Sequence, residues 1–588
     1  MGIRRHLKAT LGLLAVGSVA FAGSAFAGSN TFDVNQSAGG DVVAKNYDES
    51  GAYKQIGDSN NVYVKEQAAG NDSSDTAKIL LEQYGNSNSV TVNNSQTAGG
   101  NALIKVKQGT DSSAVEGNVI AVGTQTATNG NATLHVQQYT DHNSVHINNS
   151  TANNNNDFEI VQEGTSYNVI LIDTQNAGGN QTSQITQDGS SSTAHSHLDI
   201  SQQTAALDIS NTVHQTADSN GINDITIAIQ NSTGGSITNN LTQQNSGDNA
   251  NQITIASQTA SNDIVNTMSQ SGNGDQISVS VQTAGADINN NITQSGAGDV
   301  VTVETQTANS GHIYNTVTQT GDSNNVVLNQ SADQNIDVTI SMNGNNNLAR
   351  IKGSSTSGSD TVNITVNGSD TKIAGVSYDS SSGTLTFNQS GYARQSAQND
   401  NTLTITAGSS DTFGIYQEAS SGANTFSANV GDDNVNLVYQ VASSGDNSVN
   451  ITEGSTNYAS VYQNGGTNSL TLNLTDTNKV LGSYLDSDNH VVAYASSDDM
   501  PAVQTGADTN VMDIEVASGN TNTFAIHQEA STENYFHASV NGSNNNIYVY
   551  QTASTTAYAD ITVASDGNTL KIHQNSASGS ATVEAYVE

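Results

Sequence analysis

Carboxamide side chains have the most regular spacing in this chain. Gln258, Gln270, Gln282, Gln294 and Gln306 lie twelve residues apart. A carboxamide carries two N–H donors and one carbonyl acceptor, so glutamines that lie above one another can form a hydrogen-bonded ladder, as in stacked β structures. The chemistry that this spacing predicts is hydrogen bonding along a stack of chain segments.

The predicted ladder extends well beyond these five residues. Gln-led segments such as QIGDSN and QYTDHN recur along most of the chain, and eight of them place Asn or Asp five residues after the glutamine. The candidate ladder residues are Gln55, Gln83, Gln138, Gln215, Gln244, Gln258, Gln270, Gln282, Gln294, Gln306, Gln319, Gln417, Gln440, Gln463, Gln528, Gln551 and Gln574. The candidate rung Asn and Asp residues are Asn60, Asn88, Asn143, Asn220, Asn249, Asp275, Asp299 and Asn324.

Short β-strands must position these amides. Apolar residues follow most of the rung Asn and Asp residues at alternate positions, as Val90 and Val92 follow Asn88. Period two is typical of a strand with one buried face, and the Gly, Asn, Asp and Ser residues between such runs favour tight turns. The sequence therefore predicts an all-β fold, a β-solenoid of stacked two-strand rungs with about 24 residues per rung in a first block and 23 in a second.

The second block is duplicated. Its glutamines are evenly spaced at one per rung, and the segment TFGIYQEA around the first of them returns as TFAIHQEA in a second copy. The first copy contains Gln417, Gln440 and Gln463, and the second contains Gln528, Gln551 and Gln574. Pro501 is the only proline and lies between the two copies. Because proline cannot donate a hydrogen bond to a sheet, it predicts a break in the stack.

The predicted organisation has six parts. They are a secretory signal peptide at 1–27, Gln/Asn-rich solenoid repeats at 28–347, an irregular connecting β segment at 348–408, a first copy of the second block at 409–463, a spacer with Pro501 at 464–518, and a second copy with a C-terminal strand at 519–588.

The first residues favour export. Arg4, Arg5 and Lys8 precede an apolar run, and Ala25-Phe-Ala forms a small-residue cleavage site. No second long apolar run follows, so the sequence predicts no transmembrane helix. The absence of cysteine excludes disulfides and thiolate metal sites.

The composition is polar and acidic. Three of the 15 basic residues lie in the predicted signal peptide, which leaves 12 against 54 acidic ones, a formal charge of −42. No Lys or Arg lies between Lys107 and Arg350, so we expect no nucleic acid partner, because phosphate binding depends on basic side chains. A hydrophobic content of only 34% is also compatible with disorder, but the strand pattern and the regular repeat favour a folded stack.

The segment QYGNSNSVTV at residues 83–92 resembles the repeat of curlin, the major subunit of curli fibres. The resemblance covers 31–347 best. It implies an extracellular bacterial amyloid at the surface of a Gram-negative cell, which is exported through an outer-membrane pore and polymerises into biofilm matrix, and it implies a nucleating subunit as a further partner. The sequence departs from the curlin pattern at Ile264, Ile288 and Ile313, where the family has Ser six residues before the glutamine.

The strand pattern continues close to both ends of the sequence. Val34 and Gln36 lie near the predicted cleavage site, and Val583, Ala585 and Val587 lie at the other end. Because soluble solenoids need terminal caps, this pattern predicts head-to-tail stacking with the chain itself as the main partner. The alternative is a surface adhesin that stays monomeric and uses tyrosines of the second block for contact.

The sequence predicts no metal or catalytic site. The GNGD and GAGD turns lack the glycine-to-aspartate spacing of calcium-binding β-rolls. The pairs His195/His197 and His142/His146 have no evident third ligand, so we predict exposed strand residues and no metal. The scattered carboxylates form no catalytic pair. We therefore expect no catalytic residues, no cofactor and no enzymatic activity.

Overall fold

Alternation of buried and exposed side chains defines the strands. In β6 (Ala77–Tyr84), for example, Ala77, Ile79, Leu81 and Gln83 are buried and the residues between them are partly exposed. Because successive side chains of a strand point to opposite faces, each strand contributes one face to the interior. The fold is all-β, as predicted, and consists of parallel sheets whose strands are connected by short turns.

The computed structural model describes residues 17–20 and most of 31–587. The gaps within the longer range are 38, 40–41, 46–54, 57–59, 85–86, 110–116, 140–141, 165–166, 190–193, 219–220, 246–250, 369, 371, 374–375, 380–383, 388–392, 409–410, 455–456, 476–477, 482, 486–490, 494–501, 507, 519–521, 543 and 565–566. Of the predicted signal peptide only Gly17–Ala20 (β1) is described, and Pro501 lies outside the described residues.

The chain forms two compact units. Unit 1 comprises Met1–Gly296. Its sheet A contains β1, β3 (Val42–Lys45), β4 (Gln55–Ile56), β6, β8 (Ala102–Gln108), β10 (Ala132–Tyr139), β12 (Asn156–Gly164), β14 (Gln181–Gly189), β16 (Ile209–Ala217), β18 (Ile237–Asn245), β20 (Ile264–Ser271) and β22 (Ile288–Ser295). Its sheet B contains β2 (Thr31–Ser37), β5 (Asn61–Ala68), β7 (Ser89–Ala98), β9 (Val119–Ala127), β11 (Asn143–Ala152), β13 (Tyr167–Ala177), β15 (His195–Ala205), β17 (Ile222–Ser232), β19 (Gln252–Ala260) and β21 (Gln276–Ala284).

Unit 2 comprises Ala297–Glu588. Its sheet A contains β24 (Ile313–Thr320), β26 (Ile336–Asn343), β28 (Asp360–Asn367), β33 (Asn401–Thr406), β35 (Asn424–Asn429), β37 (Asn447–Glu453), β39 (Asn468–Leu474), β44 (Thr509–Val516), β46 (Glu533–Asn541), β48 (Thr556–Ala564) and β50 (Ser580–Val587). Its sheet B contains β23 (Val300–Ala308), β25 (Asn325–Ala332), β27 (Leu348–Ser355), β29 (Lys372–Ile373), β32 (Ala393–Ala397), β34 (Thr412–Ala419), β36 (Val435–Ala442), β38 (Asn457–Gly465), β40 (Asn478–Leu481), β43 (Ala502–Gly506), β45 (Thr523–Ala530), β47 (Asn546–Ala553) and β49 (Thr569–Ser576).

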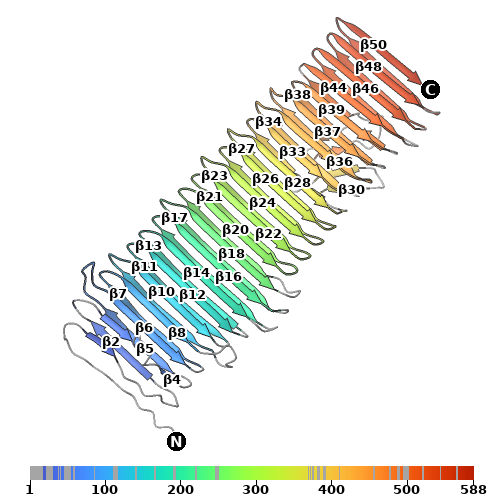
Figure 1. The fold of residues 1–588 in the computed structure, drawn as a ribbon. Coiled ribbons are helices and arrows are strands. Elements are labelled where there is room, and N and C mark those ends of the chain that lie inside the picture. The colour runs from blue at the N-terminus through green and yellow to red at the C-terminus, as the bar shows by residue number, and fades with distance from the viewer. Residues whose placement is uncertain are drawn as a thin grey trace. The chain divides into compact units, whose positions relative to one another are not determined.

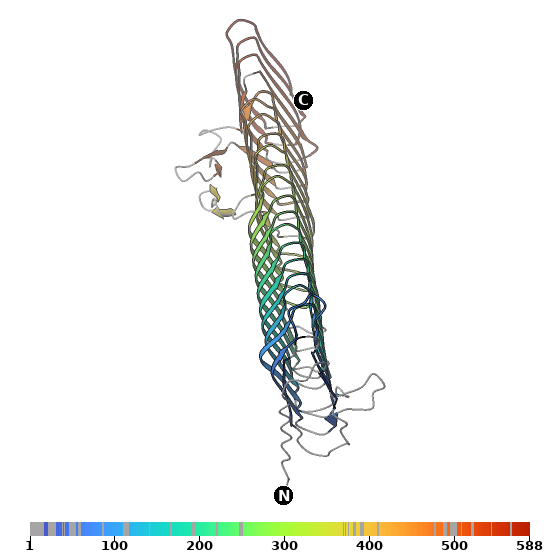
Figure 2. The ribbon, with the colours of Figure 1, turned by 90° about the vertical axis from the view of Figure 1, so that its left-hand side faces the viewer.

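Strands of one sheet pair in parallel with the strand one rung earlier or later. In unit 1 Ile264 lies opposite Ile288, and in unit 2 Gln417 lies opposite Gln440. This pairing gives the stacked parallel arrows of Figure 1 and, seen from the side, the facing layers of Figure 2. The two sheets of each unit enclose a narrow core of Val, Ile and Ala with a row of buried Gln and Asn. The predicted β-solenoid and its rung lengths are therefore confirmed.

The turns stack as closely as the strands. Side-chain oxygens accept backbone N–H groups of the next turn, from Asn131 to Asn101 at 2.9 Å and from Asn155 to Asn131 at 3.1 Å. A Cβ on Gly285 would lie 1.9 Å from the carbonyl oxygen of Ser261 in the previous turn. Glycine is therefore required where turn backbones approach this closely.

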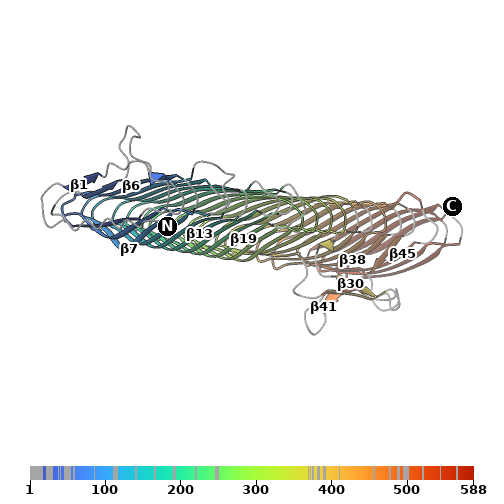
Figure 3. The same ribbon diagram turned by 90° about the horizontal axis from the view of Figure 1, so that it is seen from below.

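A third, antiparallel sheet breaks the repeat in unit 2. This sheet, sheet C, consists of β30 (Val376–Asp379), β31 (Thr384–Phe387), β42 (Val491–Ala493) and β41 (Ser483–Leu485). Its strands come from two inserts, one between β29 and β32 and the other between β40 and β43, so each insert interrupts a strand of sheet B. Figures 2 and 3 show sheet C beside the main sheets, with β41 next to β38 and β30 next to β34.

The irregular segments are therefore shorter than the predicted 348–408 and 464–518. Most of both ranges forms regular rungs: β27, β28, β32 and β33 in the first, and β39, β40, β43 and β44 in the second. The turns lengthen only at the two inserts, and the paired strands on either side keep the stack. Among the described residues no helix is long and apolar enough to cross a bilayer.

Candidate functional site

The first carboxamide ladder runs through sheet A of unit 1. Gln138 Nε2 donates to Gln108 Oε1 at 2.9 Å, and Gln138 Oε1 accepts from Gln162 Nε2 at 2.9 Å. Gln138 Nε2 also donates to the main-chain carbonyl of Ser144 in sheet B at 3.2 Å. The amide is thus satisfied without water, which removes most of the cost of burying it. Bonds of 2.7–3.0 Å join Gln83, Gln108, Gln138, Gln162, Gln187, Gln215, Gln243, Gln270 and Gln294 in order.

A second ladder runs through sheet B. In unit 1 it joins Gln36, Gln67, Gln96 and Gln125, and then Gln175, Gln203, Gln230, Gln258 and Gln282. In unit 2 it joins Gln395, Gln417, Gln440, Gln463, Gln504, Gln528, Gln551 and Gln574. The glutamines that were predicted as one series with a twelve-residue spacing thus alternate between two ladders on opposite sheets.

The ladders have a direction. Within each hydrogen-bonded run, every glutamine after the first donates to the glutamine of the preceding rung, as Gln440 does to Gln417 at 2.7 Å. Asparagine ladders run the other way: Asn401 donates to Asn424 at 2.8 Å, and Asn424 donates to Asn447 at 2.9 Å. Aligned amide chains polarise one another and strengthen each bond. Because the Gln and Asn ladders run in opposite directions, the dipole of one ladder also offsets the dipole of the other.

Part of unit 1 carries a two-dimensional amide network. Gln258 and Asn266 exchange two hydrogen bonds across the core at 3.1 and 2.9 Å, while each also bonds along its own ladder. The same reciprocal pair is formed by Gln203 with Asn211, Gln230 with Asn239, and Gln282 with Asn290. These pairs join the two sheets by hydrogen bonds where an ordinary core would use apolar contacts.

One predicted ladder residue is wrong by one position. Gln244 is exposed, and Gln243 is the buried residue that donates to Gln215 and accepts from Gln270. Alternation from the buried Leu241 places Gln243 on the inner face, so Gln244 must point outward.

Two predicted rung asparagines, Asn220 and Asn249, lie outside the described residues. Nearby, Asn223 and Asn251 are buried ladder residues, which are joined by a 3.1 Å bond. Asn223 lies eight positions after Gln215, whereas Asn88 lies five positions after Gln83, so the turns between them differ in length. A fixed offset from the glutamine cannot follow turns of different lengths.

The remaining predicted residues occupy core positions. Asn60, Asn88, Asn143 and Asn324 are buried. Gln306 is buried and pairs with Asn315, and Gln319 donates to the Asp299 carbonyl. The backbone of Gln55 pairs with that of Gln83, but its side chain lies outside the described part. The prediction omitted other ladder glutamines, such as Gln96 and Gln125, whose signal is a Gln-Thr-Ala triplet at the end of a strand.

Aspartates replace asparagine at two ladder positions. Asp275 accepts the backbone N–H of Asn251 at 2.7 Å, and the backbone N–H of Asp299 donates to Asn324 Oδ1 at 2.9 Å. Both side chains are fully buried. A carboxylate has no donor, so an aspartate cannot pass a hydrogen bond to the next side chain of the ladder.

Two further acids are buried in unit 2. Burial raises the pKa of Glu453 well above its ordinary value, and neither carboxyl oxygen has a hydrogen-bond partner among the described residues. Burial likewise raises the pKa of Asp360 to about 7, and the charge of Asp337 adds to the effect. The neighbouring Ser355 side chain and Ser396 backbone act in the opposite direction and lower the pKa of Asp360.

Tyrosines of the second block stack on the outer face of sheet B. The rings of Tyr416 and Tyr439 lie 5.5 Å apart and those of Tyr439 and Tyr462 4.5 Å apart, with interplanar angles of 9°. Burial, followed by the neighbouring tyrosines, raises the pKa of Tyr439. Tyr550 lies in the same row, between His527 and His573, whereas Tyr548 lies in the next row. The rings mostly face one another, so a partner would meet their edges.

Histidines pair with carboxylates of the neighbouring rung. His197 Nδ1 lies 3.0 Å from Asp224 Oδ2, which raises the His197 pKa, and His146 Nε2 lies 3.3 Å from Asp173. Burial lowers the pKa of His195, whose ring centroid is 6.3 Å from that of His197. The part of the chain that the structure describes contains no group of three or more His, Asp or Glu placed to hold a metal ion.

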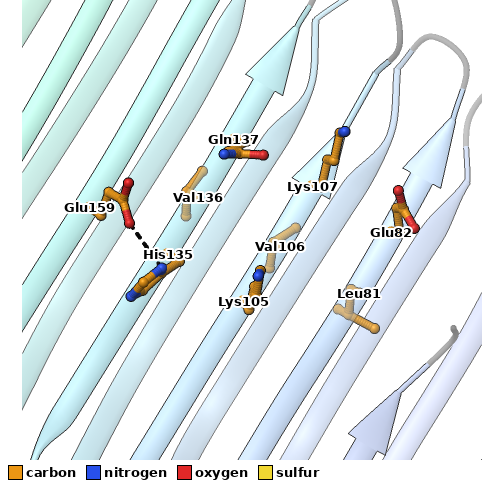
Figure 4. A pocket seen from close by; sticks show the side chains of 9 residues that line it. All are labelled: Leu81, Glu82, Lys105, Val106, Lys107, His135, Val136, Gln137 and Glu159. Atoms are coloured by element: carbon orange, nitrogen blue, oxygen red, sulfur yellow. Dashed lines mark ion pairs between the residues drawn. The ribbon is translucent and has the colours of Figure 1, made fainter. Parts of the chain in front are cut away.

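A depression on the outer face of sheet A in unit 1 is lined by residues of β6, β8, β10 and β12 (Figure 4). His135 Nδ1 lies 3.0 Å from Glu159 Oε2, and Lys105 and Lys107 lie between these two residues and Glu82. Two lysines and two glutamates line this depression, so its charges balance and the surface favours neither an anion nor a cation.

Comparisons with protein-family models, curated proteins and solved structures gave no match. The chain is a parallel β-solenoid with stacked Asn and Gln ladders.

Proposed function

We propose that this chain is an extracellular structural subunit that stacks head to tail into curli-like amyloid fibres of a biofilm matrix, where it supports adhesion and aggregation. The observation that carries the proposal is the stacking of like rungs through parallel sheets and carboxamide ladders. Val583 and Val587 are 46% and 59% exposed, whereas Ala559 and Val563, at the same positions one rung earlier, are buried. An apolar edge strand with unpaired backbone groups is a template for another chain.

The interior supports the same proposal. Backbone pairs hold each rung to its neighbours, and carboxamide bonds join most of the rungs, so an added rung of the same kind gains what an internal rung gains. A net bond energy of about 0.5–1.5 kcal/mol per buried amide, repeated at every ladder position, favours growth by stacking.

The partners follow from this function. The main partner is another copy of the chain, and the curlin-like repeat at residues 83–92 favours export through an outer-membrane pore of a Gram-negative cell, with a nucleating subunit to start growth. A chain without cysteine and with 34% hydrophobic residues can cross such a pore unfolded, because it forms no disulfide on the way.

Seeded assembly tests the proposal. The exported form should stay monomeric at first and then form fibres, with a lag that preformed fragments shorten, and aligned fibres should give a meridional reflection at about 4.8 Å. A protein that stays monomeric on ageing, with or without seeds, would instead support the monomeric adhesin.

A further inference from the structure

The first strand of sheet B has a spacing that differs from its neighbours in unit 1. In β2 one residue separates the buried Val34 from the ladder residue Gln36, whereas in β5 two residues separate Val64 from Gln67. The pairing of β2 with β5 therefore contains a register shift after Val34. The following strands of unit 1 keep the longer spacing, with two residues in most of them, as between Val122 and Gln125 in β9.

The same short spacing is found at the far edge of sheet B in unit 2. One residue separates Ile572 from Gln574 in β49, as one residue separates Val549 from Gln551 in β47. Strand β2 thus fits β49 without a register shift, although it does not fit its own neighbour in this way.

We propose that β2 of one copy pairs in parallel with β49 of the next copy, with Gln36 opposite Gln574. This inference rests on the proposed fibre function and specifies how the copies meet. In this register Phe32 lies opposite Leu570, Val34 opposite Ile572, and Asp33 opposite Lys571. Two apolar pairs and one pair of opposite charges therefore coincide with the pairing of the ladder glutamines. Opposite charges at facing positions of neighbouring strands are stabilising, whereas like charges are not.

The direction of the Gln ladder agrees with this register. Gln574 Nε2 donates to Gln551 Oε1 at 2.6 Å and to the Thr582 carbonyl at 3.1 Å, and no described residue donates to Gln574 Oε1. Gln36 Oε1 accepts from Gln67 at 3.2 Å, and Gln36 Nε2 donates to the Val43 carbonyl at 3.2 Å. Since the glutamines near both ends of the sheet B ladder donate toward the preceding rung, Gln36 of an added copy would donate to Gln574 of the copy before it. Two β49 edges could not pair in this way, because each offers an acceptor.

The other sheet adds a condition. Strand β1 pairs with β3, with Gly17 opposite Val42, so in the full-length chain it occupies the sheet A edge of the first rung. The proposed junction therefore requires the exported form, from which the predicted signal peptide has been removed.

Cysteine cross-linking tests the register, because the natural chain has no cysteine. Two singly substituted chains, Gln36→Cys and Gln574→Cys, are mixed, assembled and oxidised. Facing residues of paired strands have Cα atoms about 4.8 Å apart, within the range of about 4.4–6.8 Å that a disulfide spans. We expect covalent dimers in fibres and none in monomers. The control Ile572→Cys, mixed with Gln36→Cys, shifts the pair by two residues, about 6.6 Å along the strand, and should give little cross-link.

Charge reversal provides a second measurement. Asp33→Lys should slow seeded elongation by about tenfold, because an attraction replaced by a repulsion of unit charges about 5 Å apart in water changes the equilibrium by about this factor. Lys571→Asp should have the same effect, and mixing the two singly reversed chains should restore growth at the junctions where opposite charges meet.

The outcomes separate the two proposals. If the wild-type chain forms no fibres, the proposed function is wrong. If it forms fibres, but both cysteine pairs cross-link equally or charge reversal leaves elongation unchanged, the fibre function stands and this junction is wrong.

Discussion

The buried carboxyl of Asp360 allows a sharp test of the ladder chemistry. Asp360 precedes Asn401 in the column of residues that continues as the longest Asn ladder of unit 2. Asn401 Oδ1 is buried and has no hydrogen-bond donor among the described residues, and both Asp360 oxygens also lack one. Ser355 and Ser396 lower the Asp360 pKa somewhat, but neither forms a hydrogen bond of good geometry with its oxygens. The change Asp360→Asn places an N–H donor where the ladder lacks one.

The magnitude follows from the pKa of Asp360, which burial raises from 3.8 to about 7. The folded chain then holds a proton that the unfolded chain has released between about pH 4 and pH 7. Stability contributed by this group is therefore complete below pH 4, falls as the pH rises through this window, and is lost above pH 7. About three pKa units correspond to about 4 kcal/mol at pH 8, and a new amide bond adds about 1 kcal/mol at any pH.

The assay is denaturant unfolding of wild type and Asp360→Asn between pH 4 and pH 8, with hydrogen exchange of peptides from β28 and β33 as the local readout. We expect the variant to be more stable by about 1 kcal/mol at pH 4 and by about 5 kcal/mol at pH 8. Asp433→Asn, at an exposed turn, controls for the loss of one negative charge. A difference between variant and wild type that is the same at pH 4 and pH 8 would refute the reasoning.

Three other predictions follow from the structure. Gln243→Ala removes the bonds to the ladder neighbours on both sides and should lower the free energy of unfolding by about 2–4 kcal/mol. The adjacent Gln244→Ala, at an exposed site, should change the free energy of unfolding by less than about 0.5 kcal/mol. Equal effects of the two variants in urea unfolding would contradict the assignment of Gln243 to the inner face. Replacing 482–501 by a short turn removes β41 and β42, two strands of sheet C, which lie on the outer side of β36 and β38. The deletion should raise hydrogen exchange in β36 and β38, while β20 and β22 serve as the internal control. Unchanged protection of β36 and β38 would mean that sheet C does not shield this face. Seeded elongation should speed up with added salt or calcium, because carboxylates such as Asp263 and Asp287 lie one rung apart. Two unit charges about 4.8 Å apart in water repel by about 0.9 kcal/mol. An elongation rate independent of ionic strength would count against this repulsion.

The sequence predicts the strands of each rung more reliably than it predicts which side chain enters the core at the end of a strand. Period two indicates which residues share a face, since alternate side chains of a strand lie on one side. Recurring glutamines indicate which strands lie at equivalent positions in successive rungs. The same rule would have identified Gln243 by counting from Leu241, whereas counting from the QNSGDN motif selected Gln244. A short motif marks the approximate position of a turn, and strand alternation decides which side chain enters the core.

Turn lengths limited the prediction of the rung asparagines. Asn223 and Asn251 are buried ladder residues, and each lies eight positions after its ladder glutamine where the motif predicts five, because the stack aligns strands rather than turns. Backbone pairing in register requires the strands to match, while a turn can lengthen outside the stack at little cost. For the same reason the inserts around β30 and β41 leave the rungs on both sides intact.

Local alternation and repetition are enough to predict the all-β solenoid, its rung lengths and the carboxamides as its recurring core. Three features appear only in the folded chain: the glutamines form two ladders with one direction of donation, two inserts far apart in the sequence pair as sheet C, and Asp360 is buried beside an incomplete ladder. These features depend on which groups the stacked rungs bring together and shield from water, and such contacts join residues that are distant in the sequence.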